Sequence, residues 1–267
     1  MKGLRRHPFR VTGRFFWFAG EVVLALIDFL FHCAFRSKKS GLAGRALWLH
    51  RISRRVLRIF KLEPQVTGPV PSRGLLVSNH LSYFDIVVLM AVTPAVFVAK
   101  REIKSWPVIG WLAKLAGTLF IDRKRRSDVR QLTDEIRTVL NQGTLVILFP
   151  EGTSSGGHGV LPFKSSLLEP AVRQAHPITV GCIGYALEDG DVSEDICYWR
   201  DMTFFPHMLN LLSKRTVRAF VRFSRFEHDG TDRKELARQL RSEVLKLREG
   251  PIGENCEEPK ISAGNLS

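Results

Sequence analysis

Residues 75–91 read Leu-Leu-Val-Ser-Asn-His-Leu-Ser-Tyr-Phe-Asp-Ile-Val-Val-Leu-Met-Ala, which is two apolar runs joined by a short polar turn. The first run is short and follows Gly74, and this pattern predicts a buried strand. The second run begins at Phe84 and predicts a helix. His80 then lies on a strand-to-helix turn, which is where α/β proteins place functional side chains. This unit therefore predicts an α/β domain with a site at His80.

His80 and Asp85 are the two side chains of this unit that could take part in acid–base catalysis. They are five residues apart, so on one regular helix their side chains would point about 140° apart. They meet only if His80 lies on the turn and Asp85 points back from the start of the helix. The result is an imidazole held by a carboxylate, the arrangement of a general base that takes a proton from a hydroxyl. The alternative is structural, since Asn79-His80 before a helix is also typical of a cap and a hydrogen-bonded histidine.

The rest of the chain alternates between strand and helix patterns. Leu145–Phe149 is continuously apolar, as in a sheet buried on both faces. Strands are expected at 96–99, 117–121, 145–149, 178–185 and 216–224, and helices at 105–116, 124–141, 164–175, 204–213 and 232–247. We therefore expect an α/β fold with a mostly parallel buried sheet flanked by helices.

Positive charge is concentrated at the N-terminus. The net charge is +14, and residues 1–62 hold 14 Lys or Arg against Glu21 and Asp28, which is +12 of that total. Nucleic-acid binding is one expectation for such a segment. Here the basic residues are interleaved with long apolar runs, which suits an anionic membrane surface better. We therefore expect a membrane partner and no nucleic acid.

An apolar stretch at residues 15–35 is close to the length that spans a bilayer. Glu21 and Asp28 are seven residues apart, hence on one helical face, and two charges at that depth are costly in lipid. We therefore expect a helix half sunk in the membrane, or one whose acidic stripe faces protein. A full span and a core helix of a soluble domain are the alternatives. A cleaved signal peptide is disfavoured because Arg36, Lys38 and Lys39 follow the apolar stretch.

A second N-terminal helix is expected from residue 43 to residue 61. Leu49, Ile52 and Val56 share one face, and arginines occupy much of the rest. A basic amphipathic helix that contains Trp48 is typical of a membrane surface. The alternative is a helix packed on the main domain with a solvated basic face.

Two further blocks accompany the His80 turn. Residues 117–123 read Gly-Thr-Leu-Phe-Ile-Asp-Arg, and residues 149–153 read Phe-Pro-Glu-Gly-Thr. In this order and spacing the chain resembles the glycerolipid acyltransferase family, also called lysophospholipid or 1-acylglycerol-3-phosphate acyltransferases. The family's signatures are Asn-His-four residues-Asp, Gly-two residues-Phe-Ile-Asp-Arg, and Phe-Pro-Glu-Gly-Thr. The resemblance covers roughly residues 64–225, and the three blocks together are specific.

The resemblance implies transfer of a fatty acyl group from acyl-CoA or acyl carrier protein to the free hydroxyl of a lysophospholipid. The leading acceptor is 1-acylglycerol-3-phosphate, which gives phosphatidic acid in phospholipid biosynthesis. His80 would be the base, with Asp85 fixing its tautomer. A thioester is already activated, so no cofactor and no metal are expected. The enzyme would be associated with the cytoplasmic face of the inner or plasma membrane.

The patterns along the chain, together with the resemblance, predict a division into three parts. Residues 1–62 would be membrane-docking helices, 63–249 the catalytic domain and 250–267 a disordered tail. Residues 63–74 hold three prolines and two glycines, which predicts a linker into the catalytic domain. The four cysteines form no paired or zinc-like pattern, which fits reduced thiols in a cytosol-facing protein.

By resemblance, Arg123 and the Glu151-Gly152-Thr153 turn shape the pocket for a glycerol phosphate. A guanidinium matches a phosphate geometrically, and Gly152 lets backbone N–H groups approach an anion closely. The alternatives are a surface ion pair between Arg123 and Asp122, and a Glu151 carboxylate that stabilises the turn.

One position departs from the family. The third block often continues as Arg-Ser, and the arginine is a candidate phosphate contact, but here the position is Ser154. Lys164, Lys100 and Arg101 are the candidates to replace it. The acceptor therefore stays open, since a lyso-ornithine lipid or another lysophospholipid would need less grip on a phosphate. A non-catalytic peripheral lipid-binding protein is the alternative from another class, and loss of His80 or Asp85 would have supported it.

Overall fold

The computed structural model describes residues 7–31, 41–106, 108–122, 126–172, 176–228 and 232–250. A seven-stranded sheet in the order β1-β7-β6-β2-β5-β3-β4 forms its centre. The strands are β1 (Leu62–Thr67), β2 (Leu75–Ser78), β3 (Val96–Lys100), β4 (Leu119–Ile121), β5 (Val146–Leu148), β6 (Ile178–Leu187) and β7 (Val217–Phe226). Neighbouring strands are parallel except β6 and β7. The expected mostly parallel sheet is confirmed.

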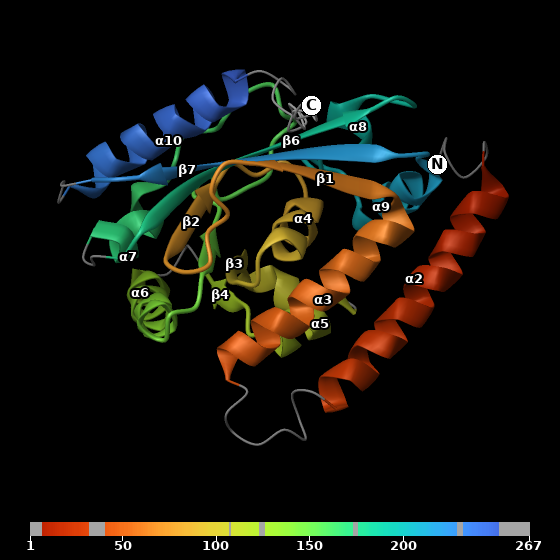
Figure 1. Cartoon of the computed structure of the whole chain (residues 1–267), viewed down its shortest axis with the longest axis horizontal. Helices are drawn as coiled ribbons and strands as arrows, with labels where there is room; N and C mark the ends of the chain where they lie inside the picture. Colours follow the sequence, from red (N-terminus) through yellow and green to blue (C-terminus); the bar gives the residue numbers. More distant parts are fainter. Residues whose placement is uncertain are drawn as a thin grey trace, which may run out of the picture.

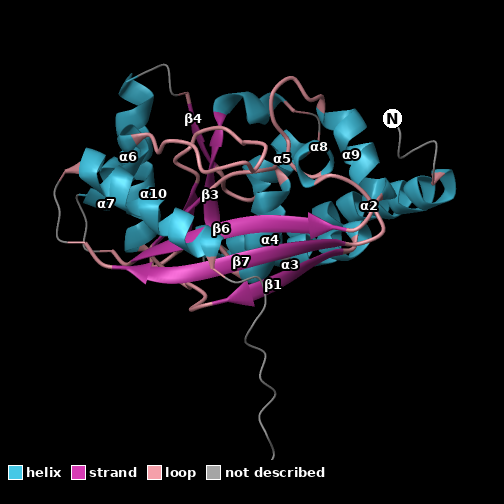
Figure 2. Cartoon of the chain, turned by 90° about the horizontal axis from the view of Figure 1, so that it is seen from above, coloured by secondary structure: helices cyan, strands magenta, loops and turns pink. Residues whose placement is uncertain are grey.

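Helices cover both faces of the sheet (Figures 1 and 2). One face carries α6 (Arg126–Asn141), α7 (Glu169–Val172) and α10 (Arg233–Glu249). The other carries α2 (Pro8–Phe29), α3 (Leu42–Phe60), α4 (Phe84–Val92), α5 (Ile109–Leu115) and α9 (Phe204–Ser213). The short elements are η3 (Arg101–Ser105), η4 (Ser165–Leu168) and α8 (Val192–Asp195).

Alternation along the central strands explains the two cores. Leu76 and Ile147 point into the core beneath α3 and α4, whereas their neighbours Leu75 and Val146 point into the core beneath α6 and α10. Successive side chains on a strand face opposite sides, so a strand covered on both sides must be apolar throughout. This is why β2 and β5 have no polar face.

Three expectations about the chain's course need correction. Residues 63–67 of the expected linker belong instead to the edge strand β1, which pairs with β7 and accepts Pro64 because an edge strand has unpaired N–H positions. The helix expected at 105–116 begins at Ile109, after η3. The helix expected at 164–175 is the short pair η4 and α7 in its described part.

The N-terminal helices α2 and α3 form an antiparallel pair against the main domain (Figure 1). The acidic stripe of α2 faces protein: buried Glu21 pairs with Arg55, and Asp28 lies 3.3 Å from Arg51. Trp48 is fully buried, and its Nε1 donates to the Ala25 carbonyl over 3.0 Å. Trp48 therefore joins the two helices and does not lie on a membrane-like surface.

Helix α2 is also fixed to the end of α9. Arg10 donates to the Ser213 carbonyl at 2.9 Å, and Arg14 donates to the Leu212 carbonyl at 3.0 Å. The last carbonyls of a helix have no partner within it, so these arginines cap α9. As a result α2 spans the domain from α3 to α9.

The outer face of α2 is apolar. Within the described residues, no helix combines the length and apolarity that a membrane span requires. The exposed apolar side chains of α2 include Phe9, Phe16, Trp17, Val23, Leu24 and Ile27, and the exposed Leu30 and Phe31 follow its last residue.

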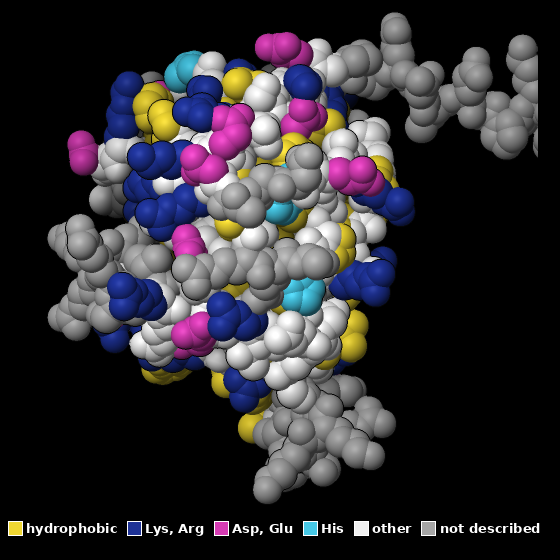
Figure 3. Space-filling view, turned by 90° about the vertical axis from the view of Figure 1, so that its left-hand side faces the viewer, with side chains coloured by type: hydrophobic (Ala, Val, Ile, Leu, Met, Phe, Trp, Pro, Cys, Tyr) yellow, Lys and Arg dark blue, Asp and Glu magenta, His cyan; other side chains and the backbone are white. Residues whose placement is uncertain are grey.

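Positive charge outside the N-terminal helices is largely matched by acids. Figure 3 shows the left-hand side of Figure 1, where Lys and Arg side chains lie among Asp and Glu. On α10, Arg238 pairs with Glu235 and Lys246 pairs with Glu243. These local pairs fit the near-neutral charge of the chain after residue 62.

Candidate active site

The turn between β2 and α4 brings His80 and Asp85 together. Asp85 is the second residue of α4, and its Oδ2 accepts from His80 Nδ1 over 2.8 Å. The same oxygen accepts the backbone N–H groups of Leu81 at 2.6 Å and Ser82 at 3.0 Å. Asp85 thus points back over the turn, which is the geometry that the sequence required for the two side chains to meet.

The bonds to Asp85 decide the tautomer of His80. A carboxylate that accepts two backbone N–H groups is an acceptor for the imidazole as well, so Nδ1 carries the proton and Nε2 keeps its lone pair. The ring stacks on Phe149 with centroids 4.3 Å apart and an interplanar angle of 18°. His80 lines the large cavity of the domain.

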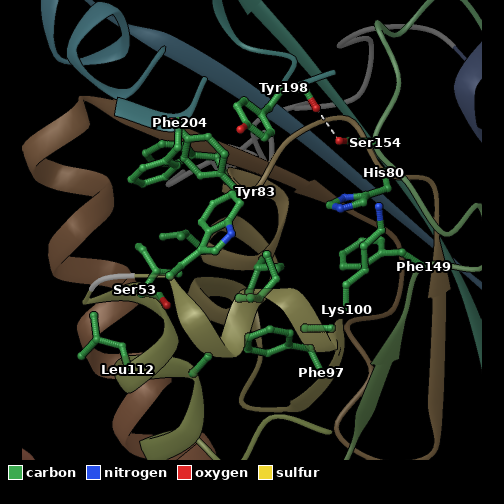
Figure 4. A pocket seen from close by; sticks show the side chains of 18 of the residues that line it. Ser53, His80, Tyr83, Phe97, Lys100, Leu112, Phe149, Ser154, Tyr198 and Phe204 are labelled. Atoms are coloured by element: carbon green, nitrogen blue, oxygen red, sulfur yellow. Dashed lines mark hydrogen bonds between the residues drawn. The ribbon is translucent and has the colours of Figure 1, made fainter. Parts of the chain in front are cut away.

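That cavity has a volume of about 580 Å³ and is mainly apolar. It lies between the sheet and the helices α2, α3, α4, α5 and α9. In Figure 4, His80, Phe149 and Ser154 lie on one side, and Ser53 and Leu112 lie on the other. Its volume is within the range of small-molecule sites, about 300–1,000 Å³. The apolar walls of this cavity are suited to bind an aliphatic chain.

Glu151 lies behind the cavity wall and not on it. Its side chain is 2% exposed; Oε1 accepts the His80 N–H at 2.8 Å, and Oε2 accepts the Leu161 N–H at 3.0 Å. Burial, opposed by these two hydrogen bonds, raises the pKa of Glu151 to about 7. This is the turn-stabilising arrangement that the sequence left open.

The residues after Glu151 reach the cavity. Gly152, Thr153 and Ser154 all line it, and Gly152 has a φ of +76°, a conformation that glycine adopts without strain. The Ser154 hydroxyl donates to the backbone carbonyl of Tyr198. Ser154 therefore joins this turn to the segment before α9.

The four cationic candidates have different positions. Lys100, at the end of β3, lines the cavity. Arg101 lies 3.2 Å from Asp128, and Lys164 is exposed with its backbone N–H on the Pro150 carbonyl. Neither of these two is on the cavity wall in the described part of the chain. Arg123 lies outside the described residues.

The turn that carries His80 is held by two further residues, Asn79 and Tyr185. The Asn79 side chain donates to the Ile183 carbonyl at 2.9 Å and accepts the Ile183 N–H at 2.8 Å, so it pairs with β6 as a strand would. The Tyr185 hydroxyl donates to Asp85 Oδ1 at 2.6 Å. The position of Asn79 directly before His80 marked it in the sequence as a residue of this turn. Tyr185 is 100 residues from Asp85, and no sequence pattern linked the two.

An aromatic wall stands beside His80. The rings of Tyr198 and Phe204 lie 5.3 and 5.0 Å from that of Tyr83, and all three line the cavity. The Tyr83 hydroxyl bonds His207 Nδ1 at 2.9 Å, and His207 Nε2 lies 3.1 Å from the Cys197 carbonyl. Burial lowers the pKa of His207 to about 4, so the ring is neutral, donates from Nε2 and accepts from Tyr83.

Comparison with known proteins decides the family. The sequence model of the family described as "Acyltransferase" matches residues 63–184. The lyso-ornithine lipid O-acyltransferase of Brucella abortus (strain 2308) is 35% identical over 246 residues, which cover 86% of this chain and 91% of that protein. The chain belongs to the glycerolipid acyltransferase family. It is an O-acyltransferase of the lysophospholipid type.

Two further similarities agree with this family. The 1-acyl-sn-glycerol-3-phosphate acyltransferase of Neisseria meningitidis serogroup B is 37% identical over 161 residues, covering 56% of this chain and 63% of that protein. The crystal structure of the 1-acyl-sn-glycerophosphate (LPA) acyltransferase PlsC from Thermotoga maritima superposes with a TM-score of 0.66. At 20% identity, covering 94% of this chain and all of that one, it shows a shared fold.

Proposed function

We propose that the protein transfers a fatty acyl group from a thioester to the free hydroxyl of a lyso-lipid, with His80 as the general base. The observation that carries the proposal is the position of His80: its Nδ1 is bound to Asp85, and its ring borders an apolar cavity. A base at the edge of a chain-sized apolar cavity is what acyl transfer to an alcohol requires.

The proposed reaction has two steps. Nε2 of His80 takes the proton of the acceptor hydroxyl as its oxygen attacks the thioester carbonyl carbon. The tetrahedral intermediate then expels the thiolate, which takes the proton from the imidazolium. Asp85 holds the ring and stabilises its positive charge. Ser82 needs no role as a nucleophile, and its side chain is fully buried.

The other cavity residues are assigned to the two substrates. The apolar walls hold the acyl chain of the donor, which is acyl-CoA or acyl carrier protein. Lys100 and the Gly152-Thr153 turn line the same cavity, and we assign them to the anionic groups: the oxyanion of the intermediate and the acceptor head group. Glu151 supports the turn from behind.

A lyso-ornithine lipid is the acceptor that we favour. The Brucella relative named for that substrate matches over most of this chain, whereas the Neisseria relative named for 1-acyl-sn-glycerol-3-phosphate matches over about half of it. The Ser154 position supports the same choice, because its hydroxyl is bound to the Tyr198 carbonyl and carries no charge for a phosphate. The acceptor placed first by the sequence, 1-acylglycerol-3-phosphate, becomes the second candidate, supported by Lys100 at the cavity.

The apolar face of α2 supports a membrane location. Phe16, Trp17 and Leu24 are between 55% and 68% exposed on this face, and α2 also lines the cavity through Phe18. A helix in this position lets lipid substrates reach the cavity from the bilayer. We assign the docking to the cytoplasmic leaflet, whose anionic lipids attract the basic N-terminus.

The experiment that tests the proposal offers purified protein a labelled acyl thioester with a panel of acceptors. Lyso-ornithine lipid, 1-acylglycerol-3-phosphate and a lysophosphatidylcholine are the three arms. Product chiefly in the first arm supports the favoured acceptor, and product chiefly in the second reverses the order of the candidates. Binding of lyso-lipid without product from any thioester contradicts the enzymatic proposal.

A further inference from the structure

The Asp85 carboxylate uses both of its oxygens. Asp85 is fully buried, and its Oδ2 serves His80 and two backbone N–H groups of the turn. Its Oδ1 accepts one hydrogen bond, from the Tyr185 hydroxyl at 2.6 Å. Tyr185 is thus the side chain that holds the oxygen facing away from His80.

Strand β6 fixes the place of this hydroxyl. Two residues before Tyr185, the backbone of Ile183 exchanges two hydrogen bonds with the Asn79 side chain. The start of the turn is therefore tied to β6 through Asn79, and its end is tied to β6 through Tyr185 and Asp85. Because Tyr185 is 9% exposed and lies within a paired strand, its ring has little freedom to move.

The direction of this hydrogen bond is set by the surroundings. Burial, together with the charge of Asp85, raises the pKa of Tyr185 well above its usual 10, so the phenol stays protonated and donates. A hydrogen bond donated to a carboxylate stabilises its negative charge. It also weakens the attraction of that carboxylate for the proton on a neighbouring imidazole.

We propose that Tyr185 is a positioning residue of the acyl-transfer reaction, which acts through Asp85 to set the orientation and basicity of His80. The inference rests on the proposed function, because the basicity of His80 matters to turnover only if His80 is the base. Tyr185 is not among the residues that line the cavity, so we assign it no contact with substrate.

Other titratable groups lie near the Asp85 carboxylate or the His80 imidazole, and the experiments leave them unchanged. Glu151, from the turn after β5, and Cys197, from the segment before α9, both interact with Asp85 through charge. Lys100 borders the cavity on the side of His80. None of the substitutions below changes these groups.

The first test measures kcat and KM against pH for Tyr185→Phe, which keeps the ring and removes the hydroxyl. We expect a KM within about twofold of wild type and a kcat lowered about tenfold at neutral pH. The acidic limb of the kcat profile should move to higher pH by about half a unit or more, because the imidazole holds its proton more tightly. A profile that overlays the wild type overturns the inference.

The matched control is Thr93→Val. The Thr93 hydroxyl is also buried and donates one hydrogen bond, to the Pro71 carbonyl at 2.7 Å, but it is outside the cavity wall. This variant loses a comparable buried hydrogen bond, so it shows what destabilisation alone does. We expect a lowered melting temperature and an unmoved pH profile. A shift equal to that of Tyr185→Phe contradicts the inference.

A second readout needs no turnover, so it separates this inference from the proposed function. The His80 imidazole is titrated by NMR, with its signal assigned by comparison with His80→Ala. Tyr185→Phe should raise its pKa. Replacing the three tyrosines of the chain with 3-fluorotyrosine, a more acidic phenol, should lower it, and the lowering should vanish in a Tyr185→Phe background. If the imidazole pKa is the same in wild type, in Tyr185→Phe and in both 3-fluorotyrosine proteins, the inference is overturned even if the protein is an active enzyme.

Discussion

The backbone N–H of His80 donates to Oε1 of Glu151 over 2.8 Å, although the two residues are 71 positions apart. The other oxygen of the same carboxylate accepts the Leu161 N–H. Glu151 therefore joins the turn that carries His80 to the loop that follows Phe149–Thr153. This relationship explains why an acidic residue in that block is buried and not exposed to the cavity.

The raised pKa of Glu151 predicts a specific dependence of stability on pH. Between pH 4.5 and about 7 the folded chain keeps a proton that the unfolded chain has lost, so this group's contribution to the free energy of unfolding falls as pH rises through that window. Glu151→Gln removes this contribution. In urea titrations, the stability of wild type relative to the variant should decrease by up to about 3 kcal/mol from pH 4.5 to 8. Parallel curves for the two proteins would contradict the prediction.

His207 predicts a dependence of the opposite sign. Its pKa is lowered from 6.5 to about 4, so between these values the unfolded chain binds a proton that the folded chain excludes. Stability from this group is complete above pH 6.5 and is lost as pH falls through 4. Relative to His207→Gln, wild type should gain up to about 3 kcal/mol between pH 4 and pH 7. Thermal or urea unfolding across this range measures the difference, and a wild-type curve that falls relative to the variant contradicts the assignment.

The two acidic residues of α2 predict unequal losses. The side chain of Glu21 is 5% exposed beside Arg55, and that of Asp28 is 17% exposed beside a more exposed arginine, Arg51. Glu21→Ala leaves a partly buried guanidinium without its carboxylate and should cost about 1–3 kcal/mol. Asp28→Ala should cost about 1 kcal/mol or less. Equal costs in urea titration would mean that burial of the first pair does not matter.

The apolar face of α2 predicts binding to anionic vesicles. Trp17→Ser combined with Leu24→Ser removes two exposed side chains and should lower the vesicle partition coefficient at least about tenfold, with little change in melting temperature. Val66→Ser is the control, because Val66 is an exposed apolar residue on the edge strand β1. Co-sedimentation that is unchanged in the double variant would remove α2 as the docking surface.

The local parts of the site followed from the sequence. The strand, turn and helix at residues 75–92 are continuous in the chain, so their hydrophobic pattern and the spacing of His80 and Asp85 contain the geometry. The class of the sheet, mostly parallel and covered by helices, also followed from the sequence, because continuously apolar strands require cover on both faces. The family blocks added the expectation of acyl transfer.

The remaining parts depend on contacts between distant segments. Tyr185 meets Asp85 only because β6 pairs with β2, and no local pattern records that register. Trp48 lies in a basic amphipathic helix, a pattern typical of a membrane surface, but in the structure it packs against α2. Residues 63–67 contain a proline and are predicted as linker from the sequence, yet they pair with β7 at the sheet edge. In each case a tertiary contact outweighed a local preference.

The measurement that tests the central claim most directly compares wild type with His80→Ala in single-turnover acyl transfer from a labelled thioester to lyso-ornithine lipid. The variant should lose about 10²–10⁴ in rate, since general-base catalysis contributes that much, while its melting temperature and vesicle binding stay close to those of wild type. A variant that is folded, binds vesicles and transfers the acyl group at a rate near that of wild type would contradict the assignment of His80 as the base.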